Sequence, residues 1–232
     1  MSVLSIIIPV YNEYATIAQI IERVVAVNFG QTRKELIIID DGSTDGTREL
    51  LRERFFDIHT IIFHEYNQGK GAAIRTGLTR AHGDVLVIQD ADLEYNPHDF
   101  LKMYNALVKN NLEVVYGSRV LDKDEKHYSS FLFHIGGLAV TWLTNLLYGV
   151  KLTDEATCYK MFTRKVLEKI SLTCRGFEFC PELTGKLLKA GFVIHEVPIS
   201  YNPRSRREGK KIKIQDGFMA LWTLARIRFF GK

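Results

Sequence analysis

The sequence predicts an α/β fold whose sheet is mostly parallel. Between residues 1 and 120, short and almost wholly apolar runs alternate with longer segments of helical periodicity. Continuously apolar strands are typical of a sheet buried on both faces, and helical crossovers between strands favour a right-handed, parallel arrangement. In such sheets ligands bind beyond the carboxyl ends of the strands. The residues that follow each strand are therefore the candidate functional residues.

The elements of the first half follow one another with short connections. The runs at 4–10 and 35–40 are apolar, and 15–27 places isoleucine and valine at helical spacing. Pro97 suits the first turn of a helix. In order, we expect a strand at 4–10, a helix at 15–27, a strand at 35–40, a helix at 45–55, a strand at 58–64, a helix at 70–82, a strand at 84–89, a helix at 97–109 and a strand at 114–117.

The second half is less regular. We expect a strand at 158–162, a helix from 164, a helix at 181–190, a strand at 192–198 and a helix at 216–230. Residues 128–150 contain no Asp, Glu, Lys or Arg. A membrane span needs ~20 apolar residues, but the glycines, threonines, His134 and Asn145 of this segment dilute its hydrophobicity. We therefore expect an interfacial helix at 130–148 that is buried or lies on a membrane surface.

The carboxyl-terminal region has two interpretations. The apolar side of its helix carries Phe218, Leu221, Trp222, Ala225 and Phe229, and Arg226 and Arg228 accompany it. Core packing is favoured, and a basic amphipathic helix on a membrane surface is the alternative. Six of the ten residues from Arg204 to Lys213 are basic. This cluster suits phosphates, anionic lipid or nucleic acid, unless it is simply a solvated loop.

Size and composition are those of an ordinary globular protein. The 232 residues are 46% hydrophobic and 25% charged, which is enough for one α/β domain with a sizeable core. Cys158, Cys174 and Cys180 are odd in number and lack CxxC spacing, which argues against a disulfide framework or a zinc site. No basic segment precedes the first strand, so we expect no signal peptide and a cytoplasmic location.

A group of carboxylates follows the strand at 84–89. Side chains two apart on an extended segment point the same way, so Asp90, Asp92 and Glu94 are expected to share one face. Clustered carboxylates repel one another unless a cation lies between them. Hard oxygen ligands suit Mg²⁺ or Mn²⁺. The plain alternative is an acidic turn before the helix at Pro97.

The ends of the first two strands form the same predicted rim. Tyr11 can stack on a nucleobase, and Glu13 and Asp41 can accept hydrogen bonds from a base or ribose, although Ser43 or Asp45 also suits a helix cap. The glycine-rich turn at 67–73 lacks the spacing of either nucleotide-binding fingerprint. It is therefore not expected to be a phosphate loop.

Four motifs together resemble glycosyltransferase family 2. They are PVYNE at 9–13, IDDGSTDGT at 39–47, NQGKGAAIRTG at 67–77 and QDADLE at 89–94. Within that family the chain is most similar to the dolichyl-phosphate mannose synthases and polyprenyl-phosphate glycosyltransferases. YGSR at 116–119, VPISY at 197–201 and the basic loop support this likeness.

The resemblance implies a GT-A fold in a single domain over 1–232, with a nucleotide-sugar-binding half at 1–120 and an acceptor-binding half at 121–232. It implies donor contacts from Pro9, Tyr11, Glu13, Ile39, Asp41, Asp90, Ala91 and Asp92. A Mg²⁺ or Mn²⁺ ion would be held by Asp90, Asp92 and Glu94. The residues implied to take part in transfer are Asp92, Arg119, Arg206 and Lys211. In the later loop Arg206 and Gly209 match the family pattern, but Ile212 stands where a Lys is expected, so Lys211 or Lys210 must substitute.

The implied reaction is an inverting displacement at an anomeric carbon. It would move a hexose, mannose or glucose, from a nucleoside diphosphate sugar to a polyprenyl or dolichyl phosphate. GDP-mannose is the favoured donor and a UDP-sugar the other. A lipid phosphate has a second pKa of ~6 and is largely ionised, so it needs cations rather than a base. The enzyme would work peripherally at the cytoplasmic face of a membrane, directly or through an anchoring subunit.

Two alternatives stay open at this point. A hydroxyl acceptor would require a general base, for which Asp154 and Glu182 are candidates. A nucleic-acid-binding module would explain the basic loop, but that loop lacks interleaved aromatic residues and leaves Asp90 and Asp92 unexplained. We therefore expect no nucleic-acid partner.

Overall fold

The computed structural model describes residues 2–121, 131–204 and 211–231. Within these ranges one seven-stranded sheet has the order β3-β2-β1-β4-β6-β5-β7. The strands are β1 (Val3–Val10), β2 (Arg33–Asp40), β3 (Thr60–Phe63), β4 (Val85–Ile88), β5 (Val114–Ser118), β6 (Lys160–Thr163) and β7 (His195–Pro198). The helices are α1 (Ile17–Ala26), α2 (Thr47–Arg54), α3 (Lys70–Arg80), α4 (Asp99–Lys109), α5 (Phe131–Tyr148), α6 (Lys165–Lys169), α7 (Phe179–Lys189) and α8 (Ile214–Phe230).

Every strand and helix expected from the sequence is present, with ends that differ by three residues or fewer. The sheet is mostly parallel, as expected: β1 pairs in parallel with both β2 and β4. The exception is β6, which runs antiparallel between β4 and β5. Because β4 has β6 and not β5 as its second neighbour, the two predicted halves of the chain share one sheet.

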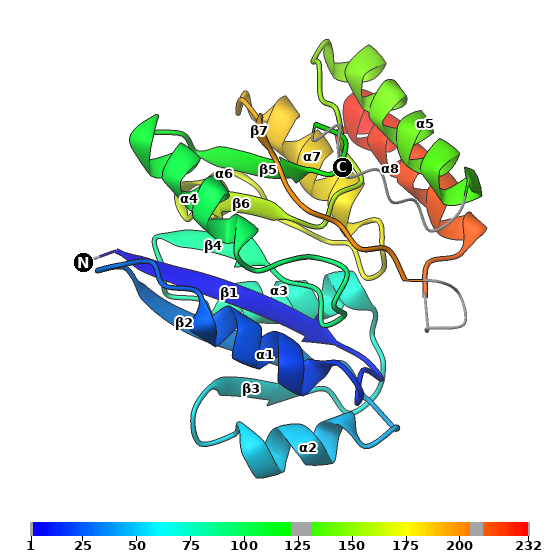
Figure 1. Cartoon of the computed structure of the whole chain (residues 1–232). Helices are drawn as coiled ribbons and strands as arrows, with labels where there is room; N and C mark the ends of the chain where they lie inside the picture. Colours follow the sequence, from blue (N-terminus) through cyan, green and yellow to red (C-terminus); the bar gives the residue numbers. More distant parts are fainter. Residues whose placement is uncertain (1, 122–130, 205–210, 232) are drawn as a thin grey trace.

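Helices cover both faces of this sheet (Figure 1). One face packs its apolar side chains against α1, α2 and α4. The other packs against α3, α6 and α7. The core residues of β1 and β2 are almost fully buried, which is why those strands read as continuous apolar runs. The register pairs Pro9 with Ile39, so the carboxyl ends of β1 and β2 lie together at one edge of the sheet.

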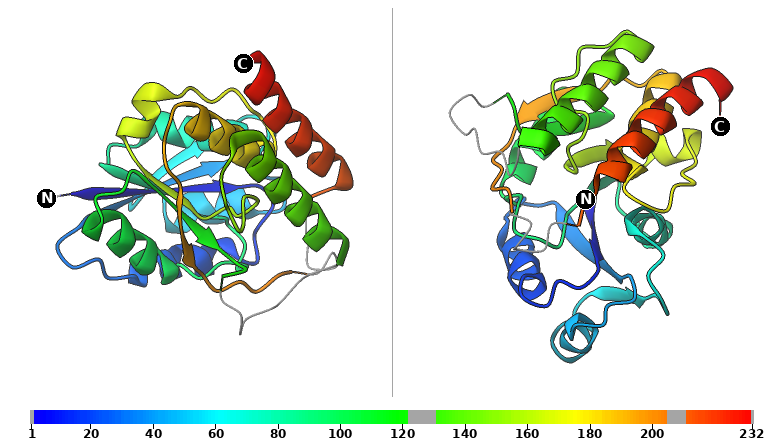
Figure 2. Two further views of the ribbon diagram at one scale, coloured as in Figure 1. Left: turned by 90° about the horizontal axis from the view of Figure 1, so that it is seen from above. Right: turned by 90° about the vertical axis from the view of Figure 1, so that its right-hand side faces the viewer.

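A pair of helices, α5 and α8, forms an outer layer beside α7, as both views in Figure 2 show. Ala220 and Leu224 of α8 pack with Val140 of α5 in a small apolar cluster. Arg228 Nε donates to the Leu147 carbonyl at 2.8 Å and ties the two helices together. No helix in the described ranges has the length and apolarity that a bilayer span requires.

The buried side of α8 differs from the one that the sequence predicts. Phe218, Trp222 and Phe229 were expected to pack, but they are 70%, 57% and 69% exposed. Leu224 and Ile227 are buried instead. The helix carries apolar residues on nearly all sides, so periodicity alone does not select the packing side.

Truncation of side chains on the two sides of α8 should lower the free energy of unfolding by different amounts. Leu224→Ala should lower the free energy of unfolding by about 2–5 kcal/mol, because it empties a fully buried site. Trp222→Ala should change it by less than about 1 kcal/mol, because the indole is mostly exposed. Urea unfolding followed by circular dichroism measures both. Equal losses would mean that Trp222 packs as the periodicity predicts.

Candidate active site

The carboxylates after β4 lie on a bend. The backbone stays with the sheet through Gln89, whose N–H donates to the Ile7 carbonyl at 2.9 Å. It then bends over residues 91–94, where Asp92 Oδ1 accepts the Glu94 N–H at 3.2 Å. The expectation of an extended segment is therefore wrong. Asp90, Asp92 and Glu94 do not alternate along a strand: Asp90 faces Lys70, whereas Asp92 and Glu94 face the segment at 201–204.

Each of these carboxylates is paired with a cation or a donor from a distant segment. Asp90 lies 2.5 Å from Lys70 Nζ at the start of α3. Asp92 Oδ2 lies 2.9 Å from Arg204 Nη2. Glu94 accepts the Tyr201 hydroxyl at 2.7 Å and the Arg204 backbone N–H at 2.9 Å. The chain that follows β7 thus crosses the bend after β4.

Glu13, at the end of β1, belongs to the same cluster. Its two carboxylate oxygens lie 2.9 and 3.0 Å from Arg204 Nη1 and Nη2, and Lys211 Nζ is 2.7 Å from its Oε1. Lys211 also donates to the backbone carbonyls of Tyr11 and Asn12. Burial opposes ionisation of Glu13, but Arg204 and Lys211 outweigh it and lower the pKa of this carboxyl. Glu13 is therefore ionised, and Arg204 and Lys211 fix its position.

The pKa values at the bend diverge in two directions. Burial raises the pKa of Asp90, but the charge of Lys70 outweighs it, so the net shift is downward. Burial and the charges of Asp90 and Glu94 raise the pKa of Asp92 to about 7. This divergence is typical of neighbouring carboxylates, because each opposes ionisation of the other.

The donor set fits Mg²⁺ or Mn²⁺ in chemistry, although it is not preassembled. Within residues 2–121, 131–204 and 211–231, no three His, Cys, Asp or Glu side chains are grouped so that they could hold a metal ion. The carboxylates of Asp90 and Asp92 are hard ligands, and their mutual repulsion favours a divalent cation. Mg²⁺ commonly takes one or two carboxylates and completes its shell with substrate phosphates. The three-residue ligand set with Glu94 stays a prediction.

Asp41 accepts hydrogen bonds from other residues of the protein. Its carboxylate accepts hydrogen bonds from His64 Nδ1 at 2.7 Å, the Gln68 N–H at 3.0 Å and the Gly69 N–H at 2.8 Å. Asp41 is 2% exposed. In this arrangement it shapes the glycine-rich turn, and its predicted contact with a nucleoside is untested.

The glycine-rich turn is closed by protein rather than open to a phosphate. The N–H groups of Gly71 and Ala72 donate to the carbonyls of Gly176 and Arg175 at 3.1 and 3.0 Å. Gly69 has φ +98°, and a Cβ there would lie 2.3 Å from the Arg175 oxygen. The first N–H groups of α3 are thus already satisfied, in agreement with the expectation that this turn is not a phosphate loop.

The other predicted donor residues line the rim formed by β1, β2 and β4. Pro9 and Ile39 are buried at paired positions. Ala91 is 4% exposed, and its carbonyl accepts the Thr16 hydroxyl at 2.9 Å. Tyr11 is half-buried, with Lys211 Nζ 5.7 Å from the centre of its ring. The structure brings these residues to one edge, next to the acidic bend.

The half-buried Arg119 pairs with the buried Asp154. Arg119 Nε and Nη2 lie 2.7 and 2.8 Å from the two Asp154 oxygens, and the Arg119 N–H donates to Oδ2 at 3.0 Å. The guanidinium also lies 5.0 Å from the ring centre of Tyr201, which binds Glu94. Burial raises the pKa of Asp154, but Arg119 outweighs it and lowers the pKa overall. A carboxylate held this way is poorly suited to be a general base.

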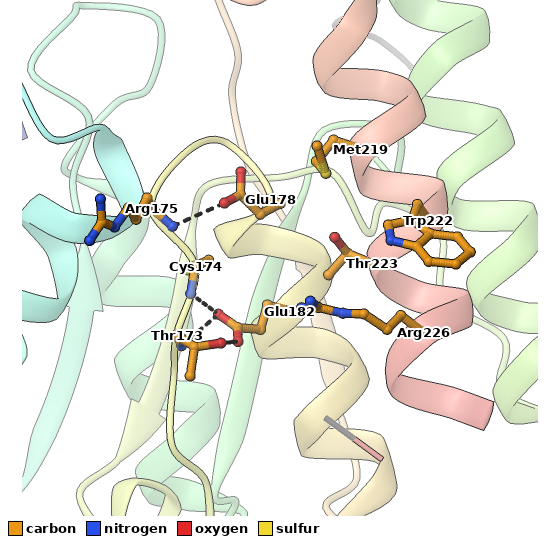
Figure 3. Close-up of a pocket in the computed structure, with 9 residues that line it drawn as sticks. All are labelled: Thr173, Cys174, Arg175, Glu178, Glu182, Met219, Trp222, Thr223 and Arg226. Atoms are coloured by element: carbon orange, nitrogen blue, oxygen red, sulfur yellow. Dashed lines mark hydrogen bonds between the residues drawn. The ribbon is translucent and has the colours of Figure 1, made fainter. Parts of the chain in front are cut away.

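Glu182, the second candidate base, holds a loop. Its oxygens accept the N–H groups of Thr173 and Cys174, the Thr173 hydroxyl at 2.7 Å and Lys186 Nζ at 2.7 Å. It lines a cavity of about 330 Å³ between this loop, α7 and α8 (Figure 3). No residue of the acidic bend lines that cavity. We therefore propose neither Glu182 nor Asp154 as a base.

Sequence reasoning did not single out Lys70 or Arg204 as site residues. Arg206, together with Gly209 and Lys210, lies outside the described residues, so its predicted role is untested. Arg204 follows β7 and lies at the edge of the sheet where β1 and β4 end. Its position shortly after a strand could have marked it as a candidate site residue. Lys70 belongs to the glycine-rich turn at 67–73, which was considered only as a possible phosphate loop, so its side chain was not considered as a partner of Asp90.

Comparison with known proteins identifies the family. The profile described as glycosyl transferase family 2 matches residues 5–171. The chain belongs to glycosyltransferase family 2. It is 29% identical to the UDP-N-acetylglucosamine–dolichyl-phosphate N-acetylglucosaminyltransferase of Methanococcus voltae, over 96% of this chain and 95% of that one. It is 30% identical to the dolichyl-phosphate β-glucosyltransferase ALG5D of Trichomonas vaginalis, over 97% of this chain and 73% of the relative.

Solved structures confirm the fold of this family 2 member. Glucosyl-3-phosphoglycerate synthase from Mycobacterium tuberculosis, in complex with UDP, superposes with a TM-score of 0.72. The superposition covers 99% of this chain and 79% of the synthase, at 17% sequence identity. The expected GT-A architecture is thereby confirmed, and the profile match over residues 5–171 confirms the resemblance to family 2.

The pKa of Glu182 predicts a pH-dependent contribution to stability. Burial raises this pKa, but hydrogen bonds from Cys174, Lys186 and Thr173 lower it from 4.5 to about 2. A lowered pKa stabilises the fold above pH 4.5, and this stabilisation is lost as the pH falls toward 2. Glu182→Gln should therefore lower the free energy of unfolding by about 1–3 kcal/mol at pH 7.

The difference between Glu182→Gln and the wild type should shrink as denaturation is repeated from pH 5 down to pH 3. Glu53→Gln, on the exposed side of α2, is the matched control and should leave stability unchanged. A difference that stays constant with pH would show that the Glu182 charge does not hold the loop.

Proposed function

We propose that this enzyme transfers a hexose or N-acetylhexosamine from a nucleoside diphosphate sugar to a polyprenyl phosphate, with inversion at the anomeric carbon. The observation that carries the proposal is the site at the carboxyl ends of β1, β2 and β4. There Asp90, Asp92 and Glu13 pair with Lys70, Arg204 and Lys211 respectively. Paired carboxylates and neighbouring cations suit a metal–diphosphate group on one side and an anionic acceptor on the other.

A UDP-sugar is the donor that we propose, in place of the GDP-mannose favoured by the sequence. The relatives named above use UDP-N-acetylglucosamine or transfer glucose, according to their names. We assign the nucleoside to the ends of β1 and β2, next to Tyr11, Glu13 and Ile39. We assign the diphosphate to Asp90, Ala91 and Asp92.

A bound Mg²⁺ or Mn²⁺ ion would supply Lewis-acid stabilisation of the departing diphosphate. Asp90 and Asp92 are the residues that we propose to hold it, and crystals of the M. tuberculosis synthase with UDP contain Mg²⁺ or Mn²⁺. The residues around them orient the donor. Lys70 fixes Asp90, and Arg204 beside Asp92 is the guanidinium that we propose to bind the diphosphate.

The acceptor that fits these residues is a phosphate monoester on a polyprenyl chain. The names of the M. voltae and T. vaginalis relatives both state a dolichyl-phosphate acceptor. Such an acceptor is already ionised near neutral pH and needs no general base. This agrees with the arrangement of Asp154 and Glu182, whose carboxylates are taken up by Arg119 and by the 173–174 loop. Arg119, Lys211 and the untested Arg206 are the cations that we assign to hold acceptor and donor together.

A lipid acceptor requires contact with a membrane, and α5 and α8 offer a surface for it. Their exposed apolar side chains are Ile135, Leu138, Trp142 and Leu146 on α5 and Phe218, Met219, Trp222, Phe229 and Phe230 on α8. Lys213 and Arg228 are exposed on or beside α8. An apolar helix face with basic neighbours suits the interface of an anionic membrane. We propose that this enzyme is peripheral and docks through this face.

Substitution of Asp92 tests the proposed chemistry. Asp92→Asn should reduce transfer from a UDP-sugar to polyprenyl phosphate by at least about 100-fold, because it weakens the hold on metal and diphosphate. Transfer by the wild type should also disappear in excess EDTA and return with Mn²⁺. Asp57→Asn, on an exposed turn after α2, is the control and should keep full activity. Full turnover in EDTA would refute the metal-dependent reaction.

Substitution on the outer helices tests membrane docking. Trp142→Ser combined with Trp222→Ser should lower partitioning onto vesicles of phosphatidylglycerol and phosphatidylcholine at least tenfold, because each buried side chain contributes about 1.5–3 kcal/mol. The control pair, Phe56→Ser with Ile58→Ser, removes similarly exposed apolar groups beside α2 and should partition as the wild type does. Vesicle co-sedimentation measures both. Equal partitioning of the two variants would contradict the assignment of this face.

A further inference from the structure

The side chain of Arg204 is a cation at the centre of the acidic cluster formed by Glu13, Asp92 and Glu94. Its guanidinium reaches both oxygens of Glu13, at 2.9 and 3.0 Å, and Asp92 at 2.9 Å. Its Nε is 3.9 Å from Glu94. The side chain is 16% exposed. One guanidinium thus meets three carboxylates that come from two different strand ends.

Within the part of the chain that the structure describes, the charges of the cluster are almost balanced without a metal ion. Among the described residues, the carboxylates of Glu13, Asp90, Asp92 and Glu94 face the side chains of Lys70, Arg204 and Lys211. A divalent cation added to this set would leave excess positive charge. A divalent cation added together with a diphosphate would not, because the diphosphate brings its own negative charge.

We propose that Arg204 is an internal counter-ion that competes with the divalent metal for Asp92 and Glu13. When the donor binds, its diphosphate binds the guanidinium in place of these carboxylates and so relieves the competition. The inference rests on the proposed function, since it concerns the same metal and donor. It makes Arg204 a positioning residue that couples the binding of metal to the binding of donor.

The backbone around Arg204 allows such an exchange to be made by the side chain alone. The Arg204 N–H donates to Glu94 Oε1 at 2.9 Å, and the Asn202 N–H donates to the Glu94 carbonyl at 2.8 Å. Tyr201 is fixed through its hydroxyl to the same carboxylate. The planar guanidinium binds carboxylate and phosphate with the same fork of donors. It can therefore move from Asp92 to a phosphate while the main chain stays in place.

Mn²⁺ affinity tests the inference without any turnover. We would titrate Mn²⁺ alone into the protein and measure free Mn²⁺ by electron paramagnetic resonance, and then repeat the titration with saturating UDP. Arg204→Met should bind Mn²⁺ about tenfold more tightly than the wild type when UDP is absent. UDP should raise Mn²⁺ affinity much more in the wild type than in Arg204→Met, because only the wild type has a guanidinium to displace.

Two further variants keep the test decisive. Arg204→Lys retains the charge without the fork and should bind Mn²⁺ alone more like the wild type than like Arg204→Met. Lys102→Met removes an ion pair with Asp99 outside the cluster and should match the wild type throughout. Equal or weaker Mn²⁺ binding by folded Arg204→Met would overturn the counter-ion role alone. Absence of Mn²⁺ binding in every protein, with or without UDP, would overturn the proposed metal-dependent function as well.

Discussion

Compensation of buried negative charge is the constraint that organises this enzyme. Parallel pairing of β1 with β2 and β4 brings three strand ends together, and with them Glu13 and the acidic bend. Carboxylates so close to one another are unstable without positive charge nearby. The start of α3 and the segment between β7 and α8 supply that charge through Lys70, Arg204 and Lys211. The route of the second half of the chain is thus tied to the chemistry of the first.

Buried carboxylates with hydrogen-bond partners also fix the loops around the site. Asp41 binds the turn before α3, Asp154 binds Arg119, and Glu182 binds the loop before α7. Each carboxylate is buried and each accepts several hydrogen bonds, which makes it an anchor for backbone that has no regular structure. Sequence position alone does not separate such anchors from catalytic carboxylates, because both types follow strands or begin helices. Their partners separate them, and the partners are visible only in three dimensions.

The sequence predicts the parts of this molecule that depend on local chemistry. Each strand and helix, and the edge of the sheet that carries Asp90 and Asp92, follows from apolar runs and from the residues after them. Three features depend on distant contacts and were not predicted. They are the reversed direction of β6, the packing side of α8 and the contacts of Arg204 with Glu13 and Asp92. The spacing of residues in a loop does not determine which side chain turns toward a cluster assembled from other strands.

The position of β6 has a consequence for how the chain acquires its structure. Both sheet neighbours of β5, which are β6 and β7, come from beyond residue 121. A nascent chain that ended at β5 would carry this strand without any partner for its backbone groups. The first N–H groups of α3 would lack their acceptors too, because these belong to residues 175 and 176. Strand β5 and the start of α3 therefore depend on contacts that the segment from β6 to β7 supplies.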